Sequence, residues 1–222
     1  MFFLNSRCPF MTLKTSKTTP ARREKGNERR RLVLAATQSL LAQRPLEEIT
    51  LADIAEAAAI PVSSLYHFYP KILNVYSDLI PVFSAELSEY LMTELGQVNV
   101  PGWQQLIDTG IDICAEFYRL NPAFQQLILS GKAPGQLKSV DRAGDARLAQ
   151  ALLEMVEFSF ELPVMPAKNE IFFNAIEIVD LFLSLDVMRN GSISASGIEE
   201  AKRACKSYLR SYLPETLYLK TS

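Results

Sequence analysis

Apolar residues recur along most of the chain with the spacing of an α-helix. Leu32, Val33, Ala36 and Leu40 form one apolar stripe, and residues 51–58 form a second at i, i+3, i+4 and i+7. No stretch alternates apolar and polar residues for long enough to form a strand. The pattern therefore predicts an all-α protein.

The first third of the chain predicts three helices, of which the third is very short. The first starts at about residue 27. The second starts at Thr50, whose hydroxyl can cap free N–H groups together with Asp53, three residues on. Pro61 fits the first turn of a helix over residues 61–69, which the next proline closes. Two helices joined by so tight a turn have the proportions of a helix-turn-helix.

The rest of the chain predicts longer helices, separated by proline, asparagine and glycine. They are expected over residues 72–95 with a proline kink, 103–120, from 122 to Gly131, from a cap at Asp141 to 160, over 169–189, and from a capping box at Ser196 to 213. The helix over 169–189 is apolar on nearly every face, so it is expected to be buried all round.

Composition fits a globular protein. With 48% hydrophobic residues, a chain of 222 residues can bury a real core. No run of about 18 apolar residues occurs, so we expect no membrane span and a cytoplasmic protein. Polar residues break the apolar start before it resembles a signal peptide, and Met11 is an alternative start to Met1. Three well-separated cysteines argue against a disulfide framework or a zinc site.

Charge is distributed unevenly, although the net charge is only −2. Residues 1–31 contain nine Lys or Arg and two Glu, a balance of +7, which leaves −9 for the remainder. A basic segment before an acidic body is one way in which a chain attaches to phosphates. Residues 1–27 are therefore expected to form a basic, disordered N-terminal arm.

The sequence contains few residue patterns that are typical of a catalytic site. The single histidine, His67, excludes most hydrolytic and metal sites that draw on several imidazoles. Asp108 and Asp112 lie four apart on one helix and could tune a general acid, but they also fit a solvated helix face. We expect no enzyme, no cofactor and no metal.

Residues 32–71, "LVLAATQSLLAQRPLEEITLADIAEAAAIPVSSLYHFYPK", resemble the DNA-binding domain of the TetR family of one-component regulators. The shared features are an Ala-Ala helix, a Thr at the next helix start, "DIAEAA", and a short helix ending in "LYHFY" and a Lys. The resemblance implies a helix-turn-helix DNA-binding domain over residues 28–75. A larger helical effector-binding and dimerisation domain would follow over residues 76–222.

Three positions depart from the family pattern. Ala59 stands where the family usually has Gly in the turn, and Pro61 stands where it usually has Ser. Lys71 follows Tyr66 by five residues, whereas six are common in the family. The missing residue changes the phase of the next helix and with it the phosphate contact that the resemblance implies for this lysine.

Helical phase divides the third helix into two faces. Leu65, Phe68 and Tyr69 lie on one face and are expected to be core residues. On the other face, small side chains suit base edges in a major groove, and Tyr66 and His67 suit phosphates. The arginines before the first helix and the N-terminus of the second could also meet phosphates. The predicted DNA contacts are Arg29, Arg30, Arg31, Thr50, Pro61, Val62, Ser63, Ser64, Tyr66, His67 and Lys71.

Aromatic residues and methionine gather on the middle helices. The resemblance implies a cavity there for a small, mainly apolar effector that releases a repressor from its operator. The expected lining is Trp103, Phe117, Phe124, Met155 and Phe158. A stripe of this kind also fits a closed core.

The last two helices are expected to form a homodimer interface, because helix-turn-helix proteins usually read paired half-sites of double-stranded DNA as two-fold dimers. The expected interface residues are Phe172, Ile176, Val179, Phe182, Leu183, Tyr208 and Tyr212. The same helices could instead be the core of a monomer. The alternative function is a helical ligand- or protein-binding dimer without DNA binding.

Overall fold

The computed structural model describes residues 20–132 and 134–220, and in this part of the chain it contains helices and no strand. The predicted all-α fold is confirmed. The elements are α1 (Pro20–Leu41), η1 (Leu46–Glu48), α2 (Leu51–Ala57), α3 (Val62–Phe68), α4 (Ile72–Leu95), α5 (Trp103–Leu120), α6 (Pro122–Ile128), η2 (Gly135–Leu137), α7 (Lys138–Ser159), α8 (Lys168–Asn190) and α9 (Ala195–Leu209).

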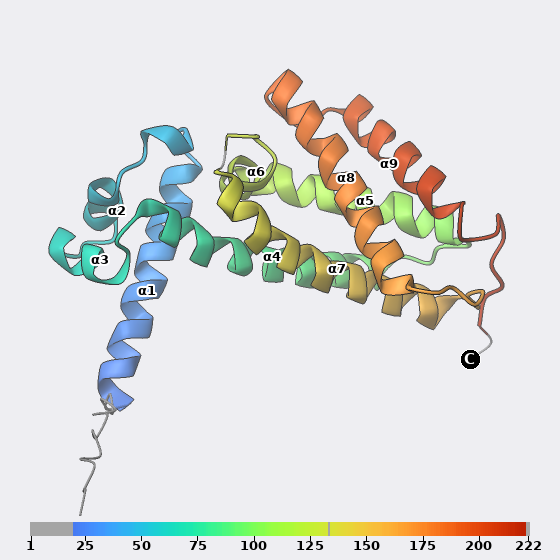
Figure 1. Cartoon of the computed structure of the whole chain (residues 1–222), viewed down its shortest axis with the longest axis horizontal. Coiled ribbons are helices and arrows are strands. Elements are labelled where there is room, and N and C mark those ends of the chain that lie inside the picture. Colours follow the sequence, from blue (N-terminus) through green and yellow to red (C-terminus); the bar gives the residue numbers. More distant parts are fainter. Residues whose placement is uncertain (1–19, 133, 221–222) are drawn as a thin grey trace, which may run out of the picture.

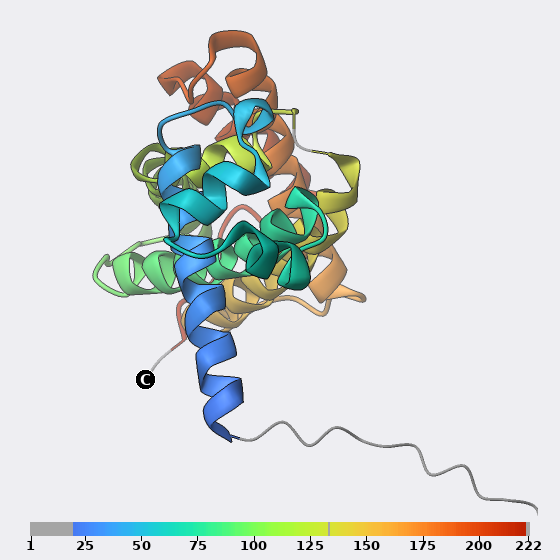
Figure 2. The ribbon, with the colours of Figure 1, turned by 90° about the vertical axis from the view of Figure 1, so that its left-hand side faces the viewer.

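The molecule is elongated, with α1, α2 and α3 at one end and α5 to α9 forming a helical body at the other (Figure 1). Helix α4 runs from the small end into the body and contacts α1, α5, α6 and α7. Seen from the small end, α1 to α3 lie in front of the body (Figure 2). None of the described helices combines the length and the hydropathy that a membrane span requires.

Helix α1 starts earlier than the periodicity predicted. It begins at Pro20, so residues 20–27, which we expected to belong to a disordered arm, are helical. Proline is tolerated at a first helical position, and the Ala, Arg, Glu and Lys that follow are good helix formers. Residues with high helix propensity can form a helix without an amphipathic stripe. The periodicity of apolar residues therefore gave no signal for this segment. The remainder of the predicted arm, residues 1–19, lies outside the described residues.

Two predicted helix starts are wrong by a few residues. Asp141 does not cap α7 but lies buried in its first turn, because α7 continues directly from η2. At α9 the cap is Ser194, whose hydroxyl accepts from the Gly197 N–H at 3.0 Å, and not Ser196. The buried carboxylate of Asp186 holds Ser194 by accepting from its N–H at 2.6 Å and its hydroxyl at 3.0 Å. The contact with Asp186 of α8 thus determines which of two nearby serines caps α9, and the local sequence does not distinguish the two.

Helix α8 packs against α7 on one side and α9 on the other. Phe172, Val179 and Leu183 are buried in these contacts. The expectation that α8 is buried all round is wrong for this single chain, because Leu181 is 54% exposed and Met188 is also exposed. An apolar helix with an uncovered apolar face has surface left for a partner.

Candidate functional site

The capping box predicted at the start of α2 is confirmed. The Thr50 hydroxyl accepts from the Asp53 N–H at 3.2 Å, and the Thr50 N–H donates to the Asp53 carboxylate at 2.8 Å. The Thr50 hydroxyl also donates to that carboxylate at 2.6 Å. Because Asp53 places negative charge at this helix start, Thr50 is less suited to a phosphate than its position alone suggests.

The turn between α2 and α3 is closed by a left-handed residue. Ala59 has φ of 51°, and the following Ile60 N–H donates to the Ala55 carbonyl at 3.0 Å. A left-handed conformation costs a residue with a Cβ about 1–2 kcal/mol. The turn therefore keeps the geometry usual for glycine and carries strain at Ala59.

Helix α3 presents a short outward face, as helical phase predicted. Leu65 is fully buried and Ser64 is half-buried. The exposed residues are Pro61, Val62, Ser63 and His67. Tyr66 is 51% exposed, with no hydrogen bond or ion pair from its side chain to another described residue. The outward face consists of small side chains at the start of α3 and larger polar rings at its end.

The prediction that Phe68 belongs to the core is wrong, since its side chain is 46% exposed and meets the His67 ring edge-on at 5.6 Å. Helix α3 ends at Phe68, and Tyr69 has the non-helical angles φ −129° and ψ 88°. This change of direction turns the Tyr69 ring into the core and leaves Phe68 outside. Helical phase could not place a residue next to a helix end that falls one position earlier than expected.

Tyr69 takes part in an ionic contact that joins α1 to α4. Its hydroxyl donates to one oxygen of Asp78 at 2.8 Å, and the Arg30 guanidinium meets the other oxygen at 2.7 Å. Burial, and then the hydrogen bond to Asp78, raises the pKa of the Tyr69 hydroxyl. Arg30, predicted to contact DNA, is thus held in an ion pair within the protein, although its side chain is 56% exposed.

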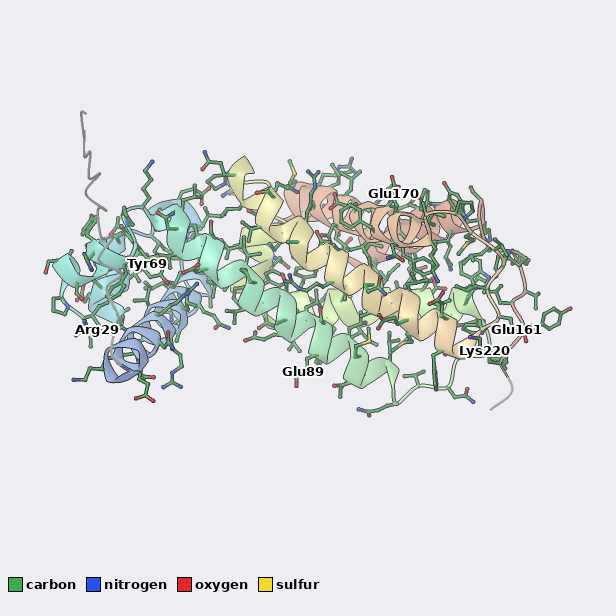
Figure 3. The ribbon with its side chains drawn as sticks, turned by 60° about the horizontal axis from the view of Figure 1, so that its bottom comes forward. Arg29, Tyr69, Glu89, Glu161, Glu170 and Lys220 are labelled. Carbon is green, nitrogen blue, oxygen red and sulfur yellow. The ribbon has the colours of Figure 1, made fainter. Side chains whose placement is uncertain are left out.

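The other predicted basic contacts are also exposed at the surface. Arg31 pairs with Glu28 one turn earlier at 2.8 Å, and both side chains are exposed, so the pair is easily released. Arg29 is exposed at the same end of the molecule as Tyr69, far from Glu161 and Lys220 (Figure 3). Lys71 is exposed directly before α4, and its N–H donates to the Asn74 side chain at 3.2 Å.

The aromatic residues of the middle helices form a packed cluster. Phe124 stacks on Phe83 at 4.9 Å and on Tyr118 at 5.1 Å, and it meets Phe117 edge-on at 6.0 Å between ring centroids. All four rings are buried. Two of the five predicted lining residues, Phe117 and Phe124, therefore lie together, in contact with other rings.

The other three predicted lining residues lie elsewhere. Trp103 is buried where its indole N–H donates to the Pro214 carbonyl at 2.9 Å, so it anchors the C-terminal segment. Met155 is half-buried, and Phe158 is 85% exposed. The lining prediction is wrong for Phe158, which follows the buried Val156 by two positions and so points about 200° away around the helix.

The predicted dimer residues are also divided by the fold. Phe172, Val179 and Leu183 face the body of their own chain and are covered, so they are wrong as interface residues. Ile176, Phe182 and Tyr208 are half-buried, and Tyr212 is exposed. Because α8 is apolar on nearly every face, sequence alone could not tell which stripe its own chain covers.

Asp108 and Asp112 reach across to α9. Asp108 meets Lys206 at 2.6 Å, and Asp112 meets Lys202 at 2.7 Å. Each carboxylate has a lysine partner, and the two pairs fasten α5 to α9. The arrangement favours a structural role over an acid that shares a proton.

One group of acidic residues was missed by sequence reasoning. Asp141 and Asp145 of α7 and Asp180 of α8 line a cleft of about 520 Å³ between these helices. Burial, followed by the mutual repulsion of the carboxylates, raises the pKa of Asp145 and of Asp180, and burial raises that of Asp141. The available signal was Asp180 within an apolar helix, together with two acids one turn apart at the start of α7.

Comparison with known families and structures identifies the same two-part arrangement. Residues 33–72 match the family model "Bacterial regulatory proteins, tetR family", and residues 101–213 match "Tetracyclin repressor-like, C-terminal domain". No curated protein sequence matches the chain.

Several solved structures share the fold. A TetR-family transcriptional regulator from Streptomyces coelicolor is 20% identical with a TM-score of 0.65, covering 83% of this chain and 99% of that one. A TetR transcriptional regulator from Rhodococcus sp. RHA1 is 15% identical with a TM-score of 0.61, covering 83% and 97%. RolR, solved in complex with resorcinol, is 14% identical with a TM-score of 0.64, covering 86% and 90%.

Proposed function

The chain belongs to the TetR family of transcriptional regulators, and we propose that it is a repressor that binds paired half-sites as a homodimer. A small effector in its C-terminal domain releases it from DNA. The family consists of non-enzymatic transcription factors, which agrees with the lysine-paired state of Asp108 and Asp112.

The observation that carries the proposal is the outward face of α3. Small side chains at Val62 and Ser63 leave room for close approach to base edges, and a serine hydroxyl can donate or accept there. Tyr66 and His67, at the other end of the same face, can hold phosphates and fix the orientation of the helix. The buried Leu65 and Tyr69 anchor α3 from behind, so this face is rigidly presented.

Among the arginines, Arg29 is the preferred phosphate contact. Arg30 neutralises Asp78 and would leave that carboxylate with only the Tyr69 hydroxyl as a partner if it turned to DNA, whereas the exposed Arg31–Glu28 pair can open at little cost. We therefore assign Arg30 a positioning role between α1 and α4.

Binding of the DNA upstream of its own gene, measured over a salt series, tests the proposal. Each lost phosphate contact makes the slope of log K against log salt shallower by about 0.9, so Arg29→Ala should change the slope of a dimer by about 2. Arg147→Ala removes an exposed arginine of α7 and should leave the slope unchanged. Equal slopes for wild type and Arg29→Ala would contradict the proposed contact.

The dimer is proposed to form through the uncovered faces of α8 and α9. Exposed Leu181 and Met188 on α8 and Tyr212, just after the end of α9, supply apolar surface, and α8 and α9 lie side by side along the body (Figure 1). Leu181→Glu should convert the dimer to a monomer in sedimentation experiments, because an interface core disfavours charge. Val98→Glu, at an exposed apolar position in the loop after α4, is the matched control.

Helix α6 is the proposed route from effector to DNA. It carries Phe124 of the aromatic cluster, and its Gln126 side chain accepts from the Leu46 N–H at 3.0 Å and donates to the Arg44 carbonyl at 3.1 Å. The same amide donates to the carbonyl of Leu41, the last residue of α1. An effector that parts the rings around Phe124 would move α6 and therefore the end of α1.

A small, mainly apolar effector suits this cluster, and a protein of the same fold binds resorcinol. Resorcinol and other small aromatic compounds are therefore the first probes to titrate into a preformed complex with DNA, where coupling is typically about 1–3 kcal/mol. Release of DNA by a member of the panel supports the repressor. Aromatic ligands that bind a protein with no affinity for DNA at low salt would favour the ligand-binding dimer instead.

A further inference from the structure

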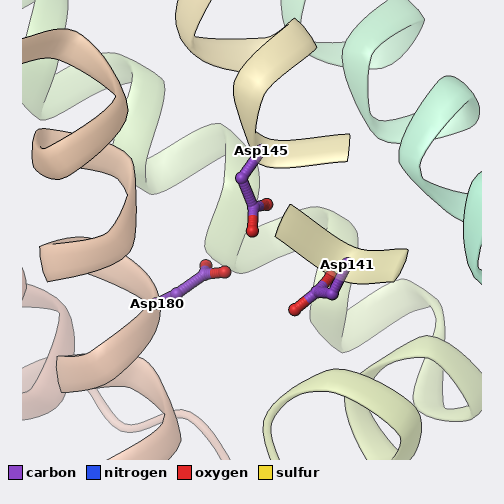
Figure 4. Close-up of side chains that lie close together, drawn as sticks. All are labelled: Asp141, Asp145 and Asp180. Carbon is purple, nitrogen blue, oxygen red and sulfur yellow. The ribbon is translucent and has the colours of Figure 1, made fainter. Parts of the chain in front are cut away.

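Three carboxylates converge in the cleft between α7 and α8. One oxygen from each of Asp141, Asp145 and Asp180 lies within 4.8 Å of the other two. Their side chains point toward the same small space from two helices (Figure 4). Nothing in the DNA-binding function derived above uses this group of acids.

Asp141 lacks the partners that Asp186, the other buried acid among the described residues, has. Asp141 is only 6% exposed, and no hydrogen bond or ion pair joins its side chain to another described residue. Asp186, similarly buried, accepts hydrogen bonds from Ser194 and Asn190. A desolvated carboxylate without a partner is unfavourable unless a cation or a proton neutralises it. The negative charge of these carboxylates therefore calls for a bound cation or a proton in the cleft.

The remaining charges of the cleft neutralise the three acids only in part. Arg142 pairs with Glu177 at 3.3 Å, so the charges of this pair cancel. Lys138 is exposed at the start of α7, one turn before Asp141, and no ion pair joins it to the three acids. With every group ionised, the cleft holds four carboxylates and two cationic side chains, which leaves an excess of negative charge.

We propose that Asp141, Asp145 and Asp180 form a binding site for a divalent cation of the size of Ca²⁺. Three oxygens within 4.8 Å of one another can all lie no more than about 2.8 Å from one central ion, which is close to the roughly 2.3–2.6 Å of Ca²⁺–oxygen bonds and longer than the roughly 2.0–2.1 Å that Mg²⁺ demands. An all-carboxylate set selects hard cations, and a cleft of about 520 Å³ has room for water at the open coordination positions. The bound ion ties α7 to α8.

The site can be tested on the full chain without DNA, so its failure would leave the proposed regulatory function untouched. Chelator-treated protein is titrated with Ca²⁺ by calorimetry and with Mn²⁺ by electron paramagnetic resonance. One ion per chain is expected, with a thermal midpoint that rises with Ca²⁺ concentration. Asp180→Asn, which keeps the shape and removes one charged ligand, should weaken binding by about tenfold or more.

Glu154→Gln is the matched control, because Glu154 is an exposed acid of α7 outside the cluster that pairs with Gln150. Circular dichroism verifies that each variant folds, and Asp145→Asn replaces Asp180→Asn if that variant does not. The proposal is overturned if wild type binds neither ion, or if Asp180→Asn and Glu154→Gln bind as wild type does.

Two further experiments test whether Lys138 or an organic ammonium group neutralises the cluster instead of a divalent cation. If Lys138 neutralises the cluster, wild type binds no metal and Lys138→Met gains binding, which overturns the proposal for the native chain. If propylammonium raises the thermal midpoint and Ca²⁺ does not, the site takes an organic ammonium group and the proposal is likewise overturned. Unchanged or tighter Ca²⁺ binding by Lys138→Met, with no response to propylammonium, supports it.

Discussion

Replacing Ala59 by glycine should stabilise the protein, although glycine usually destabilises. Ala59 has φ of 51° between α2 and α3, which costs a residue with a Cβ about 1–2 kcal/mol. Glycine removes this strain, but it also raises the conformational entropy of the unfolded chain, which lowers the free energy of unfolding by about 0.4–1 kcal/mol. The difference predicts that Ala59→Gly raises the free energy of unfolding by about 0.5–1 kcal/mol.

Equilibrium unfolding in urea measures this effect as a higher midpoint with an unchanged slope. Ala52→Gly is the matched control, because Ala52 is an exposed residue inside α2 with ordinary helical geometry. There glycine should lower the free energy of unfolding by about 0.5–1 kcal/mol. If Ala59→Gly destabilised the protein as much as Ala52→Gly does, the argument from strain in this turn would be refuted.

Three further changes have defined outcomes. Gly197→Ala should lower the free energy of unfolding by about 1–3 kcal/mol in urea, because a Cβ there overlaps the carboxyl group of Asp186. Gln126→Met should weaken the response of DNA binding to an effector, whereas Gln125→Met should not, since of the two side chains Gln126 donates to the carbonyl of Leu41 at the end of α1. An equal response would contradict the route through α6. Burial raises the pKa of Asp145 in the folded protein, so in chelator its contribution to stability is greatest below the unfolded pKa of about 4 and is lost as pH rises toward the folded value. Asp145→Asn should therefore unfold at higher urea than wild type at about pH 9, and a wild-type stability that rose from about pH 6 to about pH 9 would count against this reasoning.

The sequence predicted the helices well where a local signal decides them. Thr50 with Asp53, and the prolines around α3, fixed the helix-turn-helix because capping and proline geometry act within a few residues. The start of α1 at Pro20 was missed because helix propensity can extend a helix that has no apolar stripe.

The candidate site was predicted less completely, because its residues depend on which side of a helix is covered. Helical phase predicted correctly that Leu65 is buried and Tyr66 is exposed. Phe68 was expected in the core but is exposed, because α3 ends one residue earlier than predicted. Arg30 was assigned to DNA because Asp78, its partner, lies 48 positions further along the chain. The acidic cluster was missed for the same reason, since Asp180 and Asp145 belong to different helices.

The central claim is that the outward face of α3 binds DNA, and Tyr66 tests it most directly. Affinity for DNA upstream of the gene should be measured for Tyr66→Ala and for Tyr218→Ala, which removes an exposed tyrosine near the opposite end of the chain. A hydrogen bond to a charged phosphate contributes about 1.5–3 kcal/mol, so Tyr66→Ala should bind at least about tenfold more weakly, with the Tyr218→Ala protein unchanged. Equal affinities of both variants and wild type at low salt would contradict the account.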